Sequence, residues 1–265
     1  MTHLVHTPES LKDLIGTAPV SLVPTMGALH DGHLALVKQA KALGNPVVVS
    51  IFVNPLQFAP GEDLDAYPRT LAEDVGKLKT EGVEAVFAPS PETMYPHGPR
   101  TTIHPGPLGQ VLEGASRPTH FAGVLTVVAK LFALTGATDT FFGEKDYQQL
   151  ALIRQMVEDL HMPVRIHGCP IVRDADGLAL SSRNRYLSAA ERQTALALPK
   201  ALQTGSLAQA RSLLDATPAL TLDYLVTTTP DLGELPAGFT GEARMLVAAK
   251  VGSTRLLDNA PIQIS

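Results

Sequence analysis

The chain has 265 residues, of which 45% are apolar and 18% are charged, and its formal net charge is −5 at pH 7. This length and balance predict an ordered protein, built either as one large domain or as a medium domain plus a smaller one, and exclude a disordered chain. The lysines and arginines are scattered rather than arranged in a stripe, which excludes the basic surface of a nucleic-acid-binding protein.

The single cysteine, Cys169, excludes an internal disulfide and favours a reducing compartment. Because it lies in a largely apolar run, we interpret it as a buried structural thiol rather than a catalytic one. The segment Met1–Asp13 lacks the charged-then-apolar pattern of a signal peptide, and no apolar run is long enough to span a bilayer. We therefore expect a cytoplasmic protein with no membrane partner.

Short β-branched runs alternate with helical stretches over the first part of the chain. The predicted strands are Val20–Pro24, Val47–Val53, Glu84–Ala88, Thr140–Gly143 and Val164–Val172. The predicted helices are His33–Leu43, Thr70–Glu81, Ala122–Leu134 and Gln148–Leu160. Continuous apolar strands that alternate with helices predict an α/β fold, with a Rossmann-like, doubly wound parallel sheet covered on both faces. The segment Pro89–Gly109 predicts an ordered loop near the sheet edge or the mouth of a site.

The pattern changes after Val172, where we expect a smaller α+β domain. Ser188 and Glu191 have the spacing of a capping box, and the helical pattern continues over Ala195–Leu214. Strands are predicted at Leu222–Thr228 and Arg244–Val251, and the linker between them, Pro230–Gly241, is rich in Pro and Gly. We place the two domains at 1–172 and 173–265.

The strongest local signal is the segment Val23–His33, where a buried strand is followed by a loop and a helix start. Ligands of open parallel sheets bind beyond the carboxyl ends of the strands, and a helix N-terminus there offers N–H groups to phosphate. Gly32 lets a nucleotide approach the backbone, and His30 and His33 are spaced to face the same phosphates. A His-x-x-His pair alone also fits a metal pair or two surface histidines, but its placement favours phosphate binding.

A polar pair follows the second predicted strand, in the segment Ser50–Phe58. Asn54 precedes a proline, and Asn-Pro favours a turn. We assign Gln57 to ligand binding, because an amide offers both donors and an acceptor to a hydroxy acid without adding charge.

The segment Phe141–Gln149 ends another strand at Gly143 and places a Lys–Asp pair at the next helix start. Lys145 can hold phosphate as a point charge. Asp146 fits either a ribose contact or a helix cap, and both remain open.

The segment Arg173–Asn184 begins with the tight-turn pair Asp176-Gly177. Ser181, Ser182 and Arg183 then supply two hydroxyls and a fork of donors, which suits a phosphate chain. Arg117 fits either a further positive group of the site or a solvated surface arginine.

These four motifs, in this order and spacing, resemble the pantothenate synthetase (pantoate–β-alanine ligase) family of the nucleotidylyltransferase superfamily. The resemblance runs from about Pro24 to Leu187, with a looser C-terminal tail. Its first motif, His30-Asp31-Gly32-His33, is the His-x-Gly-His pattern of that superfamily, which alone does not separate this family from other nucleotidylyltransferases. The resemblance implies an ATP-dependent ligase that condenses pantoate with β-alanine through a pantoyl-adenylate and releases AMP and pyrophosphate.

The resemblance also implies site residues, a Mg²⁺ cofactor and a homodimer. It assigns catalysis to His33, His30 and Lys145, pantoate binding to Gln57 and Gln149, and β-alanine binding to Gln57. The implied ATP site consists of Met26, Gly27, Ala28, Leu29, His30, Asp31, Gly32, His33, Gly143, Glu144, Lys145, Asp146, Val172, Leu180, Ser181, Ser182 and Arg183. Leu180 stands where many relatives have methionine, a mild apolar change. Acidic residues near the metal in some relatives correspond to Glu73 and Asp74, which we interpret instead as helix-face charges, so the metal ligands stay unassigned.

Two rival classes of function remain. A simple nucleotidylyltransferase without a ligase step would need a second phosphate site, and the paired amides Gln57 and Gln149 suit a hydroxyl-bearing acid better. A nucleotide-binding protein without catalysis should have lost His30, His33 or Lys145, and all three are present.

Overall fold

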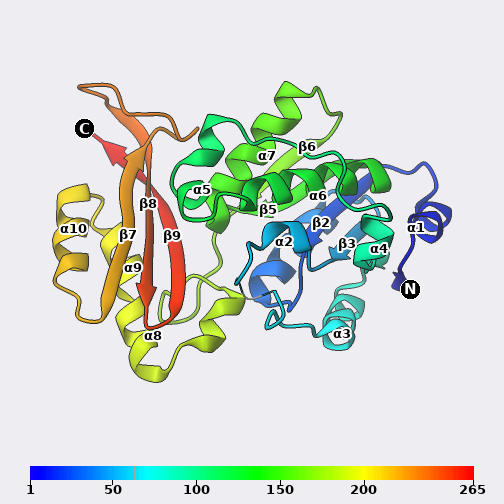
Figure 1. The fold of residues 1–265 in the computed structure, drawn as a ribbon, viewed down its shortest axis with the longest axis horizontal. Helices are drawn as coiled ribbons and strands as arrows, with labels where there is room; N and C mark the ends of the chain where they lie inside the picture. Colours follow the sequence, from blue (N-terminus) through cyan, green and yellow to red (C-terminus); the bar gives the residue numbers. More distant parts are fainter. Residues whose placement is uncertain (63) are drawn as a thin grey trace. The chain divides into compact units, whose positions relative to one another are not determined.

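The computed structural model describes residues 1–62 and 64–265, and it divides into two compact units (Figure 1). Unit 1 consists of Met1–Glu144 and Leu152–Cys169, and unit 2 consists of Lys145–Ala151 and Pro170–Ser265. The short segment Lys145–Ala151, which follows the fifth strand of the chain, therefore belongs to the C-terminal unit, and the chain then returns to unit 1.

Unit 1 is built on a parallel sheet of six strands in the order β1-β4-β3-β2-β5-β6. The strands are β1 (His3–Val5), β2 (Val20–Thr25), β3 (Val47–Ile51), β4 (Ala85–Phe87), β5 (Ala137–Gly143) and β6 (Arg165–Cys169). The prediction of an α/β fold with a parallel sheet is confirmed. The order reverses between β2 and β5, and this is the point at which open α/β sheets bind ligands.

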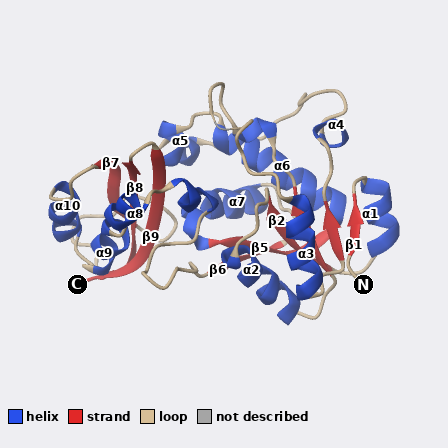
Figure 2. Ribbon diagram, turned by 90° about the horizontal axis from the view of Figure 1, so that it is seen from below, coloured by secondary structure: helices blue, strands red, loops and turns tan. Residues whose placement is uncertain are grey.

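Helices cover both faces of this sheet, and Figure 2 shows α6 on one face and α2 on the other. The helical segments of this part of the chain are α1 (Pro8–Ile15), α2 (Asp31–Ala42), η1 (Pro55–Gln57), α3 (Leu71–Glu81), α4 (Pro91–Met94), η2 (Pro107–Gln110), α5 (Glu113–Ser116), α6 (His120–Thr135), η3 (Glu144–Asp146) and α7 (Tyr147–Asp159). The core under α2 and α3 is aliphatic, with Val37, Val49, Leu78 and Val86 almost fully buried. A sheet face covered in this way leaves the ends of the strands as the places where polar groups can gather.

The first strand and helix were not predicted, because both carry weak signals. β1 has only three residues and an exposed pattern, and it pairs in parallel with β4. In α1 only Leu11 and Ile15 are buried, although Thr7 caps the helix by accepting a hydrogen bond from the Ser10 N–H. The cap and Pro8 at the first helical position were the available signals.

Unit 2 contains an antiparallel sheet in the order β7-β8-β9, packed with helices. Its elements are η4 (Ser182–Tyr186), α8 (Ala189–Ala195), α9 (Ala197–Gln203), α10 (Leu207–Asp215), β7 (Leu220–Thr228), β8 (Gly241–Val251) and β9 (Thr254–Ile264). The predicted capping box is confirmed, with both hydrogen bonds between Ser188 and Glu191 present. β9 was not predicted, although Gly252, with φ at +58°, makes the turn that pairs it with β8.

Two predicted elements differ from the structure in ways that the local sequence explains. The helical pattern over Ala195–Leu214 is interrupted, because Gly205 adopts φ of +64° and Ser206 caps a new helix. The strand predicted to reach Val172 ends at Cys169, since Pro170 has no N–H to continue the ladder.

Cys169 is 1% exposed, and burial, with a smaller contribution from the nearby Glu144 carboxylate, raises the pKa of its thiol to about 11. Because the thiolate is the reactive form, we expect a thiol reagent to leave the folded protein unmodified at pH 8 and to modify Cys169 fully in urea. A single modified thiol under native conditions, detected by intact mass, would contradict the interpretation of Cys169 as a structural residue.

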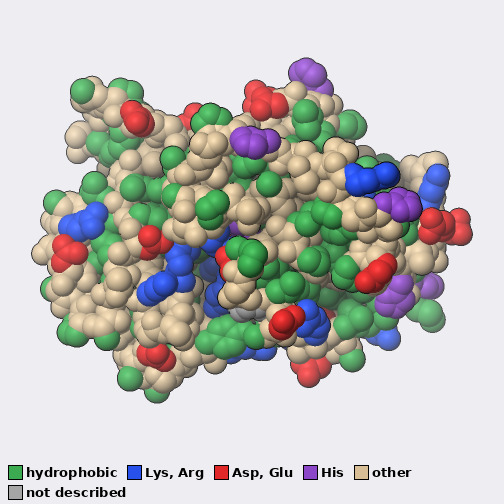
Figure 3. All heavy atoms as spheres, in the orientation of Figure 1, with side chains coloured by type: hydrophobic (Ala, Val, Ile, Leu, Met, Phe, Trp, Pro, Cys, Tyr) green, Lys and Arg blue, Asp and Glu red, His purple; other side chains and the backbone are tan. Residues whose placement is uncertain are grey.

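In the ranges 1–62 and 64–265, no helix is long and apolar enough to cross a membrane. On the face of the molecule drawn in Figure 3, Asp and Glu side chains are scattered, and several Lys and Arg side chains lie close together.

Candidate functional site

The loop Met26–His30 connects β2 to α2 at the reversal point of the sheet order. Gly27 has φ of +73°, and a Cβ at this position would lie 2.9 Å from Asp74 Oδ2 and 3.2 Å from Ile51 Cγ2. Glycine is therefore required both by the backbone conformation and by the space. The helix begins at Asp31, two residues before its predicted start at His33.

Three side chains distant in sequence hold this loop in place. The Leu29 N–H donates to Asp74 Oδ1 at 2.8 Å, and Lys77 Nζ donates to the Leu29 carbonyl at 2.7 Å. The Tyr67 hydroxyl donates to the Gly27 carbonyl at 3.1 Å. Asp74 is fully buried, with Oδ2 accepting from the Thr70 hydroxyl. The interpretation of Asp74 as a helix-face charge is therefore wrong, because its buried carboxylate anchors the loop from α3.

The two histidines form the start of α2. The His30 N–H donates to Nδ1 of His33 at 3.3 Å, and the two rings lie with their centroids 4.0 Å apart. Since Nδ1 of His33 accepts this hydrogen bond, the proton of the neutral ring is on Nε2. His33 thus combines a capping role at the helix N-terminus with a ring N–H donor, and donors at a helix N-terminus suit an anionic phosphate.

The turn after β3 is organised around the amide of Asn54, which is fully buried. Its Oδ1 accepts from the Leu56 N–H and the Tyr95 hydroxyl, and its Nδ2 donates to Gln57 Oε1 at 3.1 Å and to the Gly123 carbonyl at 3.1 Å. The prediction that Asn54 serves the turn is confirmed. The Asn54 contact also orients the Gln57 amide, so that Nε2 is the group directed away from Asn54.

The backbone of Gln57 is held from the other side by a second network. The Gln57 carbonyl accepts from Arg117 at 3.1 Å and lies 3.1 Å from His120 Nδ1. Arg117 forms a two-pronged ion pair with Glu62, with N–O distances of 3.0 and 2.7 Å, and its guanidinium donors keep the pKa of Glu62 below its ordinary value. The side chain of Arg117 is 17% exposed, so the interpretation of a solvated surface arginine is wrong.

The lysine of the third motif lies just after β5. Lys145 is 19% exposed and its Nζ lies 3.5 Å from Asp146 Oδ1, while Asp146 itself is largely open to solvent. Gln149 is half-buried in the first turn of α7, and Gly143 closes the strand. Lys145, Asp146 and Gln149 are all part of unit 2.

The fourth motif begins as a small hairpin within unit 2. The Leu180 N–H donates to the Val172 carbonyl at 2.9 Å, and Gly177 makes the predicted turn with φ of +93°. Arg192 braces the hairpin through ion pairs to Asp174 and Asp176. Ser181 then caps η4 by accepting from the Arg183 N–H at 3.3 Å.

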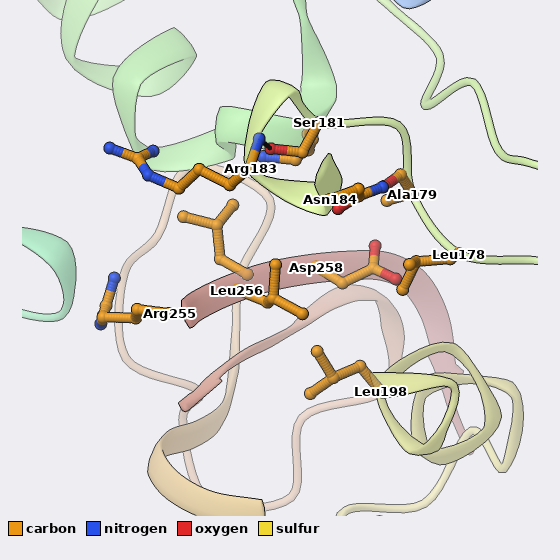
Figure 4. A pocket seen from close by; sticks show the side chains of 11 residues that line it. Leu178, Ala179, Ser181, Arg183, Asn184, Leu198, Arg255, Leu256 and Asp258 are labelled. Carbon is orange, nitrogen blue, oxygen red and sulfur yellow. Dashed lines mark hydrogen bonds between the residues drawn. The ribbon is translucent and has the colours of Figure 1, made fainter. Parts of the chain in front are cut away.

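A pocket in unit 2 brings several of these residues together (Figure 4). Its lining consists of Lys145, Leu178, Ala179, Ser181, Arg183, Asn184, Leu198, Arg255, Leu256, Leu257 and Asp258. Figure 4 shows the side chains of Arg183 and Arg255 directed to the same side of the pocket. The lining combines two guanidinium groups, one ammonium group and a serine hydroxyl, which suit an anionic ligand, with the carboxylate of Asp258. Asp258 is paired with Arg173, and Arg255 is itself paired with Asp223.

The structure thus brings together some of the site residues predicted from the sequence and adds others to them. Met26–His33 form one strand-to-helix connection of unit 1, and Lys145, Ser181 and Arg183 line one pocket of unit 2. Sequence reasoning misinterpreted Asp74 as a helix-face charge and did not single out Lys77 or Arg255. The burial of Asp74 had only a weak sequence signal, its place beside an apolar helix face, and Arg255 lies on the strand that was not predicted.

Fold and site together define a nucleotide-binding α/β enzyme. Comparison with known proteins places it more closely, because the sequence profile of the family described as pantoate-beta-alanine ligase matches residues 3–261. The chain belongs to this family, and the resemblance recognised in the four motifs is confirmed.

Relatives and solved structures agree with this placement. The pantothenate synthetase of Nocardia farcinica (strain IFM 10152) is 64% identical over 255 residues, which cover 92% of this chain and 80% of that protein. The crystal structure of pantothenate synthetase from Thermus thermophilus matches with a TM-score of 0.93 and 45% identity, covering 97% of this chain and 98% of that one. Pantoate-beta-alanine ligase from Francisella tularensis, complexed with beta-gamma ATP and beta-alanine, matches with a TM-score of 0.85 and 36% identity, covering 98% and 97%.

Proposed function

We propose that this chain is an ATP-dependent ligase that condenses pantoate with β-alanine to pantothenate through a pantoyl-adenylate. The observation that carries the proposal is the geometry of the connection from β2 to α2. There Asp74 and Lys77 hold the loop backbone, and His33 supplies a ring N–H donor. Family membership and the ligands named for the Francisella tularensis relative support the same substrates.

In the first step a pantoate carboxylate oxygen attacks the α-phosphorus of ATP. The bond from the α-phosphorus to the bridging oxygen breaks, and pyrophosphate leaves with its electron pair. His33 Nε2 and His30 donate to the phosphates, and Lys145, Ser181, Ser182 and Arg183 stabilise the charge that builds on them. Positioning and electrostatic stabilisation supply most of the acceleration in phosphoryl transfer, so no protein nucleophile is required.

In the second step the β-alanine amine attacks the acyl carbon of the adenylate. The carbon–oxygen bond to AMP breaks, AMP leaves with the electron pair, and the amine loses a proton. Gln57 and Gln149 hold pantoate through both steps, and Gln57 borders the β-alanine position. Gln57 contributes Nε2 as a donor, because its Oε1 is engaged by Asn54.

A magnesium ion completes the proposed substrate as Mg-ATP. Among the described residues no three His, Cys, Asp or Glu side chains form a cluster that could hold a metal, and the buried carboxylate of Asp74 is engaged by the loop. The described side chains therefore do not form a set of protein ligands for Mg²⁺. This ion commonly binds largely through substrate phosphates and water. We therefore assign no step to the metal.

The domain roles also belong to the proposal. Residues 1–172 form the nucleotide-binding domain with the ATP and pantoate sites, and 173–265 act as a lid that adds the phosphate contacts of Ser181, Ser182 and Arg183. The bracing of the 172–180 hairpin by Arg192 and Asp258 supports a lid that moves with the rest of unit 2 rather than by itself. We also propose a homodimer, as the resemblance implies, and a cytoplasmic location, which a single cysteine favours.

The two-step mechanism predicts that pantoate alone supports exchange of labelled pyrophosphate into ATP, because the adenylate forms before β-alanine reacts. The measurement is radiolabel recovered in ATP, with AMP followed after β-alanine is added. Reactions that lack pantoate are the control. Exchange that depends on β-alanine would exclude the two-step order, and a better phosphate-bearing acceptor would favour a simple nucleotidylyltransferase.

Replacing Gln57 with alanine should raise the pantoate KM with little change in the ATP KM. A lost neutral hydrogen bond costs about 0.5–1.5 kcal/mol, which corresponds to roughly two- to thirteenfold in KM. Gln57→Glu keeps an acceptor for Asn54 but replaces the donor by a carboxylate, so we expect a larger pantoate defect in a normally folded turn. Steady-state kinetics separate the cases, and an unchanged pantoate KM in both variants would remove Gln57 from the pantoate site.

A further inference from the structure

Lys145 belongs to unit 2, although the strand that precedes it ends in unit 1. Lys145 lines the same pocket as Ser181 and Arg183. The contacts that hold Lys145 and the hairpin leading to Ser181 are therefore both found within the C-terminal unit.

The backbone of Lys145 is held by a buried amide of β9. Asn259, which is 2% exposed, donates from Nδ2 to the Lys145 carbonyl at 2.9 Å. Its Oδ1 accepts from Nε of Arg244 on β8 at 2.8 Å. Both polar ends of the amide are engaged, so Asn259 connects the lysine segment to the antiparallel sheet.

Arg244 contacts the same segment a second time. Its guanidinium carbon lies 3.9 Å from the ring centroid of Tyr147, and Arg244 is 6% exposed. The Tyr147 hydroxyl donates to the Pro230 carbonyl at 2.8 Å. Lys145 is thus held within the C-terminal unit through its carbonyl, and Tyr147 through its ring.

The neighbouring residue of β9 holds the other phosphate-binding segment. Asp258 is 3% exposed and forms a two-pronged ion pair with Arg173 at 2.7 and 2.9 Å, while Arg173 also donates to the Gly177 carbonyl. Oδ1 of Asp258 also accepts from the Asn259 N–H at 2.8 Å. Consecutive strand residues normally point to opposite faces, yet both of these are buried and each engages a different segment of the pocket.

We propose that Asn259 and Asp258 of β9 are positioning residues that set the place of Lys145 relative to the hairpin leading to Ser181–Arg183. Buried polar groups are costly unless their hydrogen bonds are satisfied, and a satisfied network specifies one arrangement of the segments it joins. The inference rests on the proposed role of Lys145 in binding ATP phosphates.

A double-mutant cycle tests whether Asn259 acts through Lys145. The measured quantity is the Kd of ATP by calorimetry without pantoate, so no chemistry occurs. We expect Lys145→Ala to weaken binding roughly ten- to hundredfold, as for a lost charged hydrogen bond. In the protein with native Lys145, Asn259→Ala should weaken ATP binding about threefold or more. In the Lys145→Ala background the same change should weaken ATP binding less than about twofold, because the effects of coupled residues are not additive.

Asn259→Asp and Thr227→Val complete the design. Asn259→Asp keeps an acceptor for Arg244, replaces the donor to the Lys145 carbonyl by a carboxylate oxygen and adds a negative charge next to Asp258, so we expect ATP binding at least as weak as in Asn259→Ala. It carries the cycle if Asn259→Ala does not fold, because the part of its effect that acts through Lys145 disappears in the Lys145→Ala background. Thr227→Val removes a buried hydroxyl of β7 that has no hydrogen-bond partner among the described residues, and it should leave the Kd unchanged.

The outcomes are distinguishable. Equal effects of the Asn259 change in both backgrounds, with Lys145→Ala impaired, would overturn the positioning role and leave the proposed function standing. An unchanged Kd in Lys145→Ala would overturn the proposed phosphate role of the lysine and the positioning inference with it. An effect of Asn259 that disappears in the Lys145→Ala background supports the inference.

Discussion

Replacing His33 with alanine is expected to lower kcat by about 10²–10³, with a smaller change in the ATP KM. A donor aimed at charge that develops in the transition state acts there more than in the ground state, and removing one such donor costs about 2.7–4 kcal/mol. The His33 ring is suited to this role because its Nδ1 accepts from the His30 backbone, which leaves the ring proton on Nε2. Steady-state kinetics with varied ATP give both parameters.

The His33→Gln variant separates catalysis from helix capping. Glutamine at this position can accept the hydrogen bond from the His30 N–H, as it does in a capping box, so the start of α2 should keep its stability. We expect thermal unfolding close to that of the unchanged protein and a kcat that remains low. Recovery of kcat together with stability would mean that His33 serves the helix rather than the phosphates.

Gly123→Ala is expected to give the largest loss of stability among single methyl additions in the Gln57 region. A Cβ at Gly123 of α6 would lie 2.2 Å from the Leu56 carbonyl oxygen and 2.9 Å from the Gln57 nitrogen. These are backbone atoms, so no flexible side chain can move aside. Overpacking typically costs about 1–3 kcal/mol and here also displaces the turn that carries Gln57. Denaturant unfolding gives the free energy, and the pantoate KM should rise in parallel.

Gly76→Ala is the matched control for this change. Gly76 lies inside α3, and a Cβ there meets nothing within 4 Å. Alanine in a helix interior is favoured over glycine by about 0.8–1.0 kcal/mol, so this variant should be slightly stabilised with unchanged kinetics. If Gly123→Ala matched Gly76→Ala in stability and in pantoate KM, the close packing of α6 against the Gln57 turn would have no functional consequence.

Much of the fold follows from patterns that are local in sequence. The valine-rich run at β3, the Gly82 stop after α3 and the Ser188 capping box each specify a strand or a helix end through neighbouring residues. Alternation of such elements was sufficient to predict a parallel sheet. The short strand β1 and the strand β9 were missed because their pairing partners, rather than their own composition, stabilise them.

The sequence by itself predicted the candidate site at the level of motifs, because the first three motifs lie at the ends of strands β2, β3 and β5 and the fourth contains its own turn at Gly177 and cap at Ser181. Only the tertiary structure decided which side chains hold those motifs in place. Leu29 and Asp74 are 45 residues apart, Gln57 and Arg117 are 60 apart, and Lys145 and Asn259 are 114 apart. A carboxylate, guanidinium or amide at such a distance carries no local signal of its partner, since its role depends on burial and on hydrogen bonds that exist only once the chain has folded.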